Sequence, residues 1–596
     1  MRDKPIRIGG ASGYWGDSAI ATPQLLQAGG LDFLVYDYLA EVTMSIMARA
    51  RAKDPDAGYA RDFVDVVMRQ NLGEIARQKL RVIANAGGVN PTSCADALRA
   101  MIAEMGLDLR VAVVLGDDLM DRKDILTATE MFTGESFPAP EQIFSINAYL
   151  GAFPIARALD AGADIVVTGR CVDSAVTLGA CIHAFGWKPA EHDRLAAGTL
   201  AGHVLECGTQ ATGGNFTDWH LVADTLDRIG YPICEIWPDG AIEVTKPKGT
   251  GGLVSVGTVA EQMLYEVDDP QAYVVPDVIC DISQVEVTQI AQNRVRLTGA
   301  SGRMPTDSYK VSATYLDGWR AGAMATFYGS KAAAKAQAFG DAVFARARAA
   351  LRARNMADYT ETSLEILGGG SQMGEATMAD TATEVVVKYA ARHPEKEGLD
   401  ILLREASGMG LSAPPGLSGF FGTRPRPSPL VRLFSFLLPK SEVPVEIEMD
   451  AARRQVEVLD GEPFDARTLS RPTPPVAPKP DADTVTVPLE ALAWARSGDK
   501  GRNANIGIIA RDRAYLPHIW NALSEEAIAD RFGHVLKGDV TRYLLPGCAA
   551  INVVLTDALG GGGVASLRND ALGKGFAQIL LSMPVTVPKT LMEPAE

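Results

Sequence analysis

Two carboxylates near the start of the chain have the spacing of a catalytic pair. Asp37 and Glu41 stand four positions apart, and residues at this spacing share one face of a helix. Two carboxyl groups whose pKa values differ can divide the roles of general acid and general base. The structural alternative is that Asp37 caps the helix and Glu41 forms a salt bridge. Asp37 and Glu41 are the first candidates for acid and base chemistry.

Asparagines and glycines gather in the segment Asn85-Ala-Gly-Gly-Val-Asn-Pro91. The side-chain amides of Asn85 and Asn90 and the backbone N–H groups of Gly87 and Gly88 can hold a carboxylate or a carbonyl oxygen. The two glycines also permit positive φ, and the proline suits the first turn of a helix. We interpret this segment as a ligand site in addition to a turn.

Arg170 is the candidate cation, in the segment Gly169-Arg-Cys-Val-Asp-Ser174. A guanidinium group can bind a carboxylate or a phosphate through two parallel hydrogen bonds. Arg170 can equally pair with Asp117 or Asp173 inside the protein. The carboxylates of Asp117, Asp118 and Asp173 offer the oxygen ligands that divalent cations prefer, so a divalent metal is a further candidate.

A glycine-rich segment follows the first apolar run of the chain, at residues 9–18. Backbone N–H groups near Ser12 and Gly13 can bind an anion close to the start of a helix. The segment does not have the G-x-G-x-x-G order of a dinucleotide-binding loop. The structural alternative is a turn closed by a capping side chain.

Two further loops, at residues 206–216 and 245–252, are rich in glycine and polar residues. Ordering such loops costs much backbone entropy, which favours a functional role. The second loop is basic but lacks the Gly-Lys-Ser/Thr order of a P-loop; we expect it to bind phosphates of a carrier such as coenzyme A, with a hairpin at a strand end as the alternative. The candidate ligand residues in these loops are Gly213, Gly214, Asn215, Lys246, Lys248 and Gly249.

Short apolar runs precede the early polar clusters and alternate with helical stretches. Continuous apolar runs are typical of strands buried on both faces, and ligands bind beyond the carboxyl ends of such strands. The pattern predicts an α/β main domain with a mostly parallel, doubly wound, Rossmann-like sheet; a closed barrel is the alternative. The expected strands end near residues 10, 36, 84, 115 and 168, and the expected helices cover 23–27, 44–53, 61–77, 95–104 and 142–159.

The length of 596 residues indicates several domains. We place a site-bearing α/β domain at 1–250, a mixed α+β domain at 251–468, a Pro-rich linker at 469–483 and a small α+β domain at 484–596. Elements expected after residue 250 are a hairpin around 292–293, helices at 331–354 (capped by Ser330) and 516–532, and strands at 445–448, 455–458, 505–510, 540–545, 549–555 and 576–582. The apolar segment 430–438 is expected to be a core segment or a helix at a subunit contact.

Composition excludes several classes of partner. The net charge of −16 disfavours nucleic acid and anionic membrane surfaces, which attract basic patches. The seven cysteines are scattered without a C-x-x-C pair, which indicates reduced thiols and a cytoplasmic protein. No apolar stretch is long enough for a membrane span, no secretory signal is visible, and no zinc-ligand spacing is present.

Five segments together resemble the acyclic terpene utilisation AtuA family over nearly the whole chain. The part after the linker, with Ser-Gly-Asp-Lys-Gly at 497–501, is similar to the ferredoxin-like domain of that family. The resemblance implies a place in the degradation of citronellol, geraniol and branched acids as coenzyme A thioesters, but it brings no catalytic residues. The segments are Ala-Ser-Gly-Tyr-Trp-Gly-Asp-Ser (11–18), Asp-Tyr-Leu-Ala-Glu-Val-Thr-Met (37–44), Asn-Ala-Gly-Gly-Val-Asn-Pro (85–91), Gly-Arg-Cys-Val-Asp-Ser-Ala (169–175) and Glu-Cys-Gly-Thr-Gln-Ala-Thr-Gly-Gly-Asn (206–215).

We therefore expect an enzyme that acts on an acyl-CoA thioester by lyase or hydro-lyase chemistry. Asp37 or Glu41 is the expected base, and Arg170 is expected to orient a carboxylate. The expected donors to an enolate oxygen are the amide groups of Asn85, Gly87, Gly88, Asn90 and Asn215.

Two alternatives to this enzyme stay open. One is a non-catalytic binding or assembly subunit for an acyl-CoA carboxylase or hydratase, and the other is a nucleotide-dependent enzyme that uses the first glycine-rich loop. A homo-oligomer is expected in any case, because most soluble oligomers of metabolic proteins are homo-oligomers.

Overall fold

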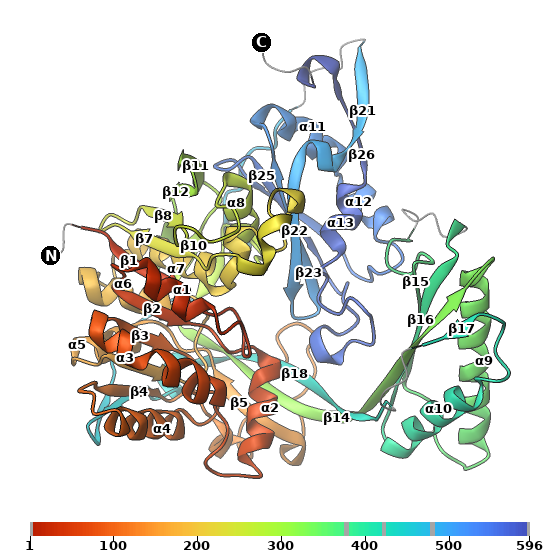
Figure 1. Cartoon of the computed structure of the whole chain (residues 1–596), viewed down its shortest axis with the longest axis horizontal. Helices are drawn as coiled ribbons and strands as arrows, with labels where there is room; N and C mark the ends of the chain where they lie inside the picture. Colours follow the sequence, from red (N-terminus) through yellow and green to blue (C-terminus); the bar gives the residue numbers. More distant parts are fainter. Residues whose placement is uncertain (1–3, 375–380, 420–424, 477–482, 593–596) are drawn as a thin grey trace.

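The early apolar runs form the centre of one large sheet (Figure 1). The computed structural model describes residues 4–374, 381–419, 425–476 and 483–592, without the side chains of residues 41, 42 and 564. Within these ranges the strand order of the sheet is β11-β12-β8-β7-β1-β2-β3-β6-β4-β19-β20. The strands are β1 (Ile6–Gly10), β2 (Phe33–Tyr36), β3 (Arg81–Ala84), β4 (Val111–Leu115), β6 (Ile165–Thr168), β7 (Ile233–Ile236), β8 (Ile242–Thr245), β11 (Glu286–Ala291), β12 (Arg294–Thr298), β19 (Glu446–Met449) and β20 (Ala452–Gln455).

Parallel pairing is confined to the middle of this sheet. Strands β1, β2, β3, β6 and β4 are parallel to one another, whereas β7 beside β1 and β19 beside β4 are antiparallel. The α/β class is confirmed, but a mostly parallel sheet is correct only for the centre. The edges are hairpins, which need no crossover segment; the Rossmann-like description stays a prediction.

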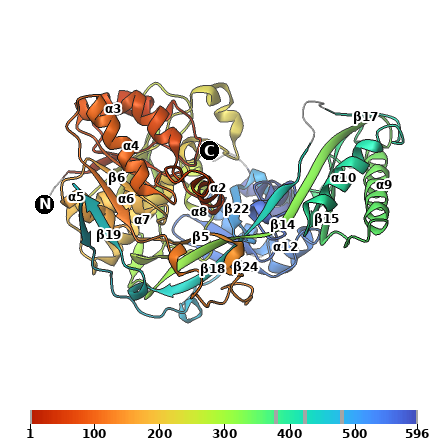
Figure 2. The same cartoon turned by 90° about the horizontal axis from the view of Figure 1, so that it is seen from below.

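Helices cover both faces of the parallel strands (Figure 2). Successive side chains of a strand point to opposite faces. In β2, Leu34 and Tyr36 therefore enter one apolar core, and Phe33 and Val35 enter the other. The first core contains α1 (Ala21–Ala28), α3 (Arg69–Gln78) and α4 (Pro91–Glu104); the second contains α5 (Phe153–Asp160), α6 (Ala175–Phe185), α7 (His192–Glu206) and α8 (Val256–Leu264).

The chain leaves the neighbouring strands β3 and β6 toward opposite faces. After β3 it enters α4, which packs in the first core, and after β6 it enters α6, which packs in the second. Neighbouring strands whose connections diverge in this way open a crevice beyond their carboxyl ends. This divergence gives the main sheet its best position for a site.

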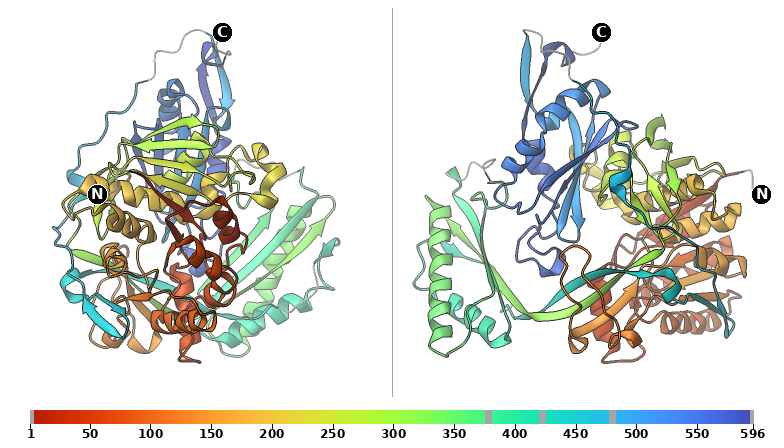
Figure 3. Two further views of the ribbon diagram at one scale, coloured as in Figure 1. Left: turned by 60° about the vertical axis from the view of Figure 1, so that its left-hand side comes forward. Right: turned by 180° about the vertical axis from the view of Figure 1, so that it is seen from behind.

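A very long strand, β14 (Ser308–Tyr328), connects the main body with an outlying lobe (Figures 2 and 3). Its first half pairs with β18 (Ser428–Pro439) and β5 (Ile143–Ala148), and its second half pairs with β16 (Glu384–His393). In the lobe, α9 (Ala332–Arg352) and α10 (Lys396–Gly408) pack on β14, β15 (Glu361–Leu367) and β16 around an apolar core of their own.

Pairing with β14 corrects one predicted helix and rules out the helical alternative for a second segment. The segments 430–438 and the first part of 142–159 form β18 and β5, while α5 begins only at Phe153. Short apolar runs fit a strand or a buried helix equally well by periodicity, so the partner strand decides. The same ambiguity affects 576–582, which forms helix α13 (Phe576–Leu581) and not a strand.

Other elements differ at their ends. Helix α9 begins after Lys331, a residue in left-handed conformation, so Ser330 is not its N-cap. The predicted helix 516–532 is split into α11 (Leu516–Ala522) and α12 (Glu525–Arg531), because the Ser524 hydroxyl accepts the N–H of Ala527 at 3.1 Å and starts a new helix. The hairpin around Gln292-Asn293 is confirmed as β11 and β12.

The last part of the chain packs against α8 (Figure 1). In this part the strand order of the antiparallel sheet is β22-β23-β25-β24, with α11, α12 and α13 associated with it. One face of the sheet forms its own core, while Ile509, Leu545 and Ala550 on the other face join the core of the main body. The strands are β22 (Ala493–Lys500), β23 (Asn503–Ala510), β24 (Val540–Leu545) and β25 (Ala550–Leu555); β21 (Thr484–Pro488) pairs with β26 (Pro584–Pro588).

A buried ion pair fixes this contact. The guanidinium group of Arg496 on β22 binds the carboxylate of Glu261 on α8 at 2.9 Å, and the two side chains are 4% and 0% exposed. Arg496 also donates to the carbonyl oxygen of Gly214 at 2.8 Å. The hydroxyl of Thr217 donates to the carbonyl oxygen of Ala495 at 3.0 Å. The last domain is therefore joined to the main body by satisfied polar contacts inside an apolar interface.

The predicted domain boundary at residue 250 stays a prediction. The main sheet itself takes strands from both sides of that point, because β12 pairs with β8 and β19 pairs with β4, while β11 and β20 extend the sheet beyond them. The linker at 469–483 is described except for 477–482. Across the described ranges, no helix combines the length and the apolar character that a membrane crossing requires.

Removing the buried carboxylate of this ion pair should destabilise the protein. Glu261→Ala leaves the guanidinium of Arg496 buried without its counter-ion, and we expect a loss of about 3 kcal/mol in the free energy of unfolding. Urea denaturation followed by circular dichroism measures it. The control is Asp358→Ala, which removes the exposed partner of Arg348, with an expected loss below about 1 kcal/mol. Equal losses in both variants would contradict the assignment.

Candidate active site

The carboxyl ends of the central strands bring four of the candidate side chains to one edge of the sheet. Asp37 follows β2, Asn85 follows β3, Asp117 follows β4 and Arg170 follows β6. They are 8%, 0%, 2% and 4% exposed. Because these strands are parallel neighbours, their ends are close together although the residues are far apart in sequence. The site predicted from the sequence requires this arrangement, in which polar residues far apart in sequence meet at one edge of the sheet.

Asn85 holds Asp37 in place. Its Nδ2 donates to Oδ1 of Asp37 at 2.5 Å, and its Oδ1 accepts the N–H of Tyr38 at 2.7 Å. Burial raises the pKa of Asp37 well above its ordinary value, and the nearby carboxylates of Asp173 and Glu206 raise it further. Both polar ends of the Asn85 amide are engaged in this way, so Asn85 positions the acid.

Arg170 is fixed by partners around it. Its Nη1 donates to Oδ1 of Asp173 at 2.6 Å and to the carbonyl oxygen of Cys171 at 2.8 Å. The guanidinium carbon lies 4.2 Å from the centre of the Tyr149 ring, an attractive cation–π distance. Asp173 is the more open member of this group, since its side chain is 38% exposed. The cluster therefore meets solvent through Asp173.

Asp117 organises the backbone beneath the cluster. Its Oδ2 accepts the N–H of Arg170 at 2.8 Å and Nδ2 of Asn147 at 2.9 Å. Residue 169 has to be glycine here, because a Cβ would lie 2.3 Å from Oδ1 of Asp117. Burial raises the pKa of Asp117 to about 7. Asp117 therefore titrates close to neutral pH and ties the end of β4 to the end of β6.

The remaining predicted amide donors are engaged elsewhere. Asn90 caps α4 and donates to the carbonyl oxygens of Pro55 and Ala57 at 2.9 and 2.8 Å. The N–H of Gly87 donates to Thr168 and that of Gly88 to Asn85. Packing also explains these glycines, since a Cβ at Gly87 would lie 2.5 Å from the Thr168 carbonyl oxygen. None of these three groups is an open donor to a substrate oxygen in this structure.

The first glycine-rich segment binds a carboxylate of its own chain. The N–H of Gly13 donates to Oδ2 of Asp17 at 2.9 Å, and Oδ1 of Asp17 accepts the Tyr231 hydroxyl at 2.7 Å. The anion position predicted here is thus filled by Asp17. Ser12 instead supports the site, because its hydroxyl donates to the carbonyl oxygen of Asp37 at 3.0 Å.

The loop after α7 is built into the contact with the last domain. The carbonyl oxygen of Gly214 accepts from Arg496. Gly213 has a φ of 108°, and a Cβ there would press on Val222 at 2.9 Å. Asn215 is exposed and has a φ of 54°. These residues shape the interface, and the structure does not bring Asn215 into the Asp37 cluster.

The basic loop after β8 lies on the same edge of the sheet as the cluster. Thr245, the last residue of β8, pairs with Ile233 of β7, which pairs with Gly9 of β1. Three strand spacings put the loop about 14 Å from the end of β2. Lys248 and Gly249 are exposed. Lys246 is half-buried, which lowers its pKa, and its Nζ donates to the carbonyl oxygen of Thr250 at 2.8 Å.

Sequence reasoning missed an ionisable pair beside Asp37. His203 Nδ1 lies 2.9 Å from Oε1 of Glu206 at the end of α7, and the side chains are 3% and 8% exposed. The ring of Tyr273 of β9 (Tyr273–Val275) packs against His203 in a tilted arrangement, with ring centres 5.5 Å apart. Nζ of Lys500, from the last domain, is 5.6 Å from the Tyr273 ring. The i, i+3 spacing of the histidine and the glutamate was the available signal, but no helix was predicted over these residues.

The predicted roles of Glu41 and of a divalent metal ion receive no support from the side chains that the structure describes. Glu41 begins helix α2 (Glu41–Arg51), but its side chain lies outside the described residues. In the described part of the chain, no three His, Cys, Asp or Glu side chains are arranged to hold a metal ion. Asp118 pairs with Arg51 at 3.0 Å instead.

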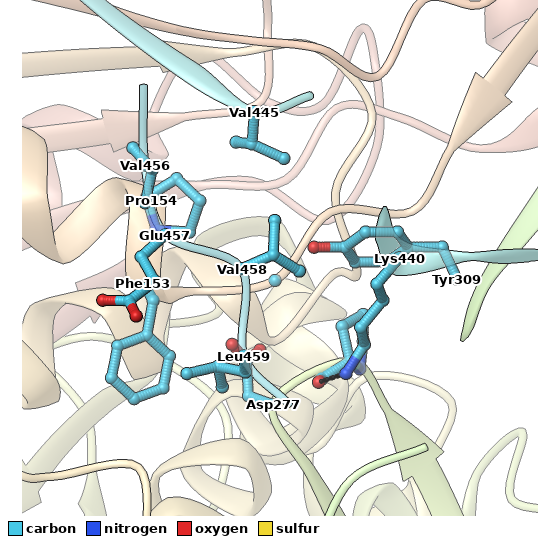
Figure 4. Close-up of a pocket in the computed structure, with 12 residues that line it drawn as sticks. Phe153, Pro154, Asp277, Tyr309, Lys440, Val445, Val456, Glu457, Val458 and Leu459 are labelled. Atoms are coloured by element: carbon cyan, nitrogen blue, oxygen red, sulfur yellow. Dashed lines mark hydrogen bonds between the residues drawn. The ribbon is translucent and has the colours of Figure 1, made fainter. Parts of the chain in front are cut away.

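A separate small cavity lies between the start of α5 and residues 456–459, which follow β20 (Figure 4). Its volume of about 10 Å³ holds no more than a single water molecule. Asp277 in its wall accepts the N–H of Ala152 at 2.9 Å, and Nζ of Lys440 donates to the carbonyl oxygen of Pro276 at 2.8 Å. We interpret this cavity as structural.

Fold and site together define the class: an α/β protein with buried ionisable side chains at the carboxyl edge of parallel strands, bordered by a small α+β domain. Residues 6–449 match the family model of the acyclic terpene utilisation family protein AtuA, and residues 487–586 match the AtuA ferredoxin-like domain. The chain belongs to the acyclic terpene utilisation family AtuA, and its last domain is ferredoxin-like. No curated protein and no solved structure matches the chain.

Titration of Asp117 should be visible in the pH dependence of stability. A carboxyl whose folded pKa is raised from 3.8 to about 7 stabilises the fold fully below pH 4, and this contribution is lost as the pH rises to 7. The expected loss is about 1.4 kcal/mol per pH unit across that window, and Asp117→Asn should not show it. Urea denaturation from pH 4 to pH 8 measures the difference between the two proteins.

The matched control is Asp164→Asn, because Asp164 also accepts a backbone N–H, that of Arg110 at 2.9 Å, but in an exposed position. Its pH profile should follow the wild type. A profile of Asp117→Asn parallel to the wild type would show that Asp117 titrates normally.

Proposed function

We propose that this protein is a cytoplasmic enzyme of acyclic terpene or branched-acid catabolism that acts on an acyl-CoA thioester by lyase or hydro-lyase chemistry. Membership of the acyclic terpene utilisation family supports the substrate class. The observation that carries the reaction class is the buried carboxyl of Asp37, oriented by Asn85 at the carboxyl ends of the parallel strands.

Asp37 suits proton transfer next to a thioester. Addition or loss of water beside such a carbonyl moves one proton to or from carbon and another to or from oxygen. A carboxyl group performs such a step best when its pKa is near the working pH, and burial raises the pKa of Asp37 in that direction. Its position is fixed by Asn85 and by the Ser12 hydroxyl on its backbone, so little reorganisation is needed during the reaction.

Arg170 supplies the positive charge of the site. It counteracts the raised pKa of Asp37, and its partner Asp173 is partly exposed. A substrate carboxylate that replaces Asp173 on Nη1 of Arg170 would keep the hydrogen-bond count unchanged. We therefore assign Arg170 the role of orienting an anionic group of the substrate.

The basic loop with Lys246, Lys248 and Gly249 is proposed to bind the phosphates of coenzyme A. Coenzyme A is here the carrier part of the substrate, and its phosphates lie far from the thioester. A loop on the same sheet edge, about 14 Å from the end of β2, suits that extended shape. A bound divalent cation and a homo-oligomer stay predictions, and no step of this proposal depends on them.

Replacing the acid should abolish turnover without loss of binding. Asp37→Asn keeps the shape and the hydrogen bond to Asn85 but cannot transfer the proton, so we expect the hydration of a branched 2-enoyl-CoA to slow by at least about 10²-fold. Absorbance of the enoyl thioester measures turnover, and calorimetric titration measures binding. Asp96→Asn, at an exposed helix pair with Arg99, is the control and should be unaffected.

Absence of both binding and turnover in the wild type at millimolar acyl-CoA would overturn the substrate class. Binding without turnover, together with capture of an acyl-CoA carboxylase or hydratase, would favour the non-catalytic assembly subunit.

Removing a positive charge from the basic loop should weaken the binding only of a ligand that carries phosphates. Lys248→Ala removes an exposed charge without disturbing the fold, and we expect the Kd for coenzyme A to rise about 10-fold. The Kd for the matching acyl-pantetheine, which lacks the nucleotide and its phosphates, should not change. Calorimetric titration of both ligands tests this. An equal effect on both ligands, or none on either, would remove the loop from the site.

A further inference from the structure

Glu206 lies beside Asp37, although the two residues are 169 positions apart in sequence. The Ser12 hydroxyl donates to the carbonyl oxygen of Asp37 at 3.0 Å. The next residue, Gly13, packs so tightly on the end of α7 that a Cβ there would lie 3.1 Å from the carbonyl oxygen of Glu206. Ser12 and Gly13 therefore bridge the two carboxyl-bearing segments. Glu206 occupies the kind of position that the sequence-based pair gave to Glu41.

One oxygen of Glu206 is held and the other is not. Oε1 accepts from Nδ1 of His203 at 2.9 Å. Within the residues that the structure describes, Oε2 is buried and has no hydrogen-bond partner, and the same holds for Oγ of Ser174. Gly202, one turn before Glu206, contacts Ser174, since a Cβ at 202 would lie 2.7 Å from Cβ of Ser174. Buried polar atoms without partners are rare in folded proteins, and one of them here belongs to the carboxylate beside Asp37.

We propose that Glu206 is the catalytic base and Asp37 the catalytic acid of the site, and that His203 is the positioning residue that orients Glu206 and favours its charged form. This inference rests on the proposed acyl-CoA chemistry and names the second carboxyl group of the pair. Burial raises the pKa of both carboxyl groups, but the imidazole of His203 and the ammonium of Lys500 act against that rise at Glu206, whereas the carboxylates of Asp173 and Glu206 add to it at Asp37. Two carboxyl groups in such different surroundings separate their pKa values.

The reaction balances as a loss of water from a 3-hydroxyacyl thioester. Oε2 of Glu206 takes the proton from the carbon next to the thioester carbonyl, and the electrons of that C–H bond form the carbon–carbon double bond. The bond between the neighbouring carbon and its hydroxyl oxygen breaks, and the oxygen receives the proton of Asp37 and leaves as water. Asp37 regains a proton and Glu206 loses one through solvent near the partly exposed Asp173.

His203 acts through charge. Burial lowers its pKa, but the carboxylate of Glu206 outweighs burial, and the net pKa of His203 is raised. The other charged or titratable groups that act on His203 come from neighbouring elements: Lys500 of the ferredoxin-like domain, Glu266 after α8 and Tyr273 of β9. Lys500 gives that domain a direct electrostatic influence on the pair.

Two substitutions separate the roles of acid and base. In full-length protein incubated with a branched 3-hydroxyacyl-CoA in D₂O, we expect Glu206→Gln to lose both deuterium uptake at the α-carbon and dehydration, each by about 10³-fold. Asp37→Asn should lose dehydration but retain α-deuterium uptake, because the base is still present. Mass spectrometry follows uptake, and absorbance of the enoyl thioester follows dehydration. Uptake unchanged in Glu206→Gln would overturn the assignment, whereas an inactive wild type that binds no acyl-CoA would overturn the proposed function itself.

A second measurement does not depend on Glu206→Gln folding. His203→Asn can still donate to Oε1 of Glu206 but carries no charge, so the pKa of Glu206 should rise and the acidic limb of the rate profile, where the base loses its proton, should move to higher pH by about one unit. The control is His183→Asn, because His183 also pairs with a carboxylate, Asp160 at 2.6 Å, but lies outside the site. A pH profile of His203→Asn identical to that of His183→Asn would show that His203 has only a structural role.

Discussion

Burying ionisable groups is the constraint on which the centre of this protein depends. A charge taken out of water is tolerated only with a partner, a hydrogen bond or a shift of its pKa. Asp37, Asp117 and Arg170 meet this demand in different ways: a side-chain amide, backbone and amide N–H groups, and an aspartate with an aromatic ring. The loops at the ends of β2, β3, β4 and β6 have little freedom left once these contacts form.

The second core of the main body connects the buried ionisable cluster to α7, α8 and the ferredoxin-like domain. Helix α7 delivers His203 and Glu206 to the cluster, and α8 carries Glu261, which binds Arg496 of the ferredoxin-like domain. Residues of that domain also belong to the core that surrounds α7 and α8. The ferredoxin-like domain is consequently packed firmly against the part of the main body that carries Glu206. Its Lys500 lowers the pKa of Glu206.

Several glycines of the sequence motifs are explained by packing and not by ligand binding. A Cβ at Gly169 would collide with Asp117, and one at Gly13 would collide with the backbone of Cys207 at 2.9 Å. These close approaches let the carboxyl-bearing loops meet. These motif glycines allow the backbone segments that carry acidic side chains to approach one another.

The sequence by itself determined the α/β class, the alternation of strands and helices up to β4, the hairpin β11–β12 and the convergence of polar groups at strand ends. These features follow from local patterns: continuous apolar runs for doubly buried strands, and polar residues directly after them. Only the tertiary structure decided that residues 143–148 and 430–438 are strands, since their pairing with β14 involves residues far away in sequence. It also decided which polar groups are open. Asn85, Asn90 and the Gly87–Gly88 amides are used up by neighbours that no local pattern reveals, whereas Glu206 comes to Asp37 through the packing of α7 against the first loop, a long-range contact set by the core.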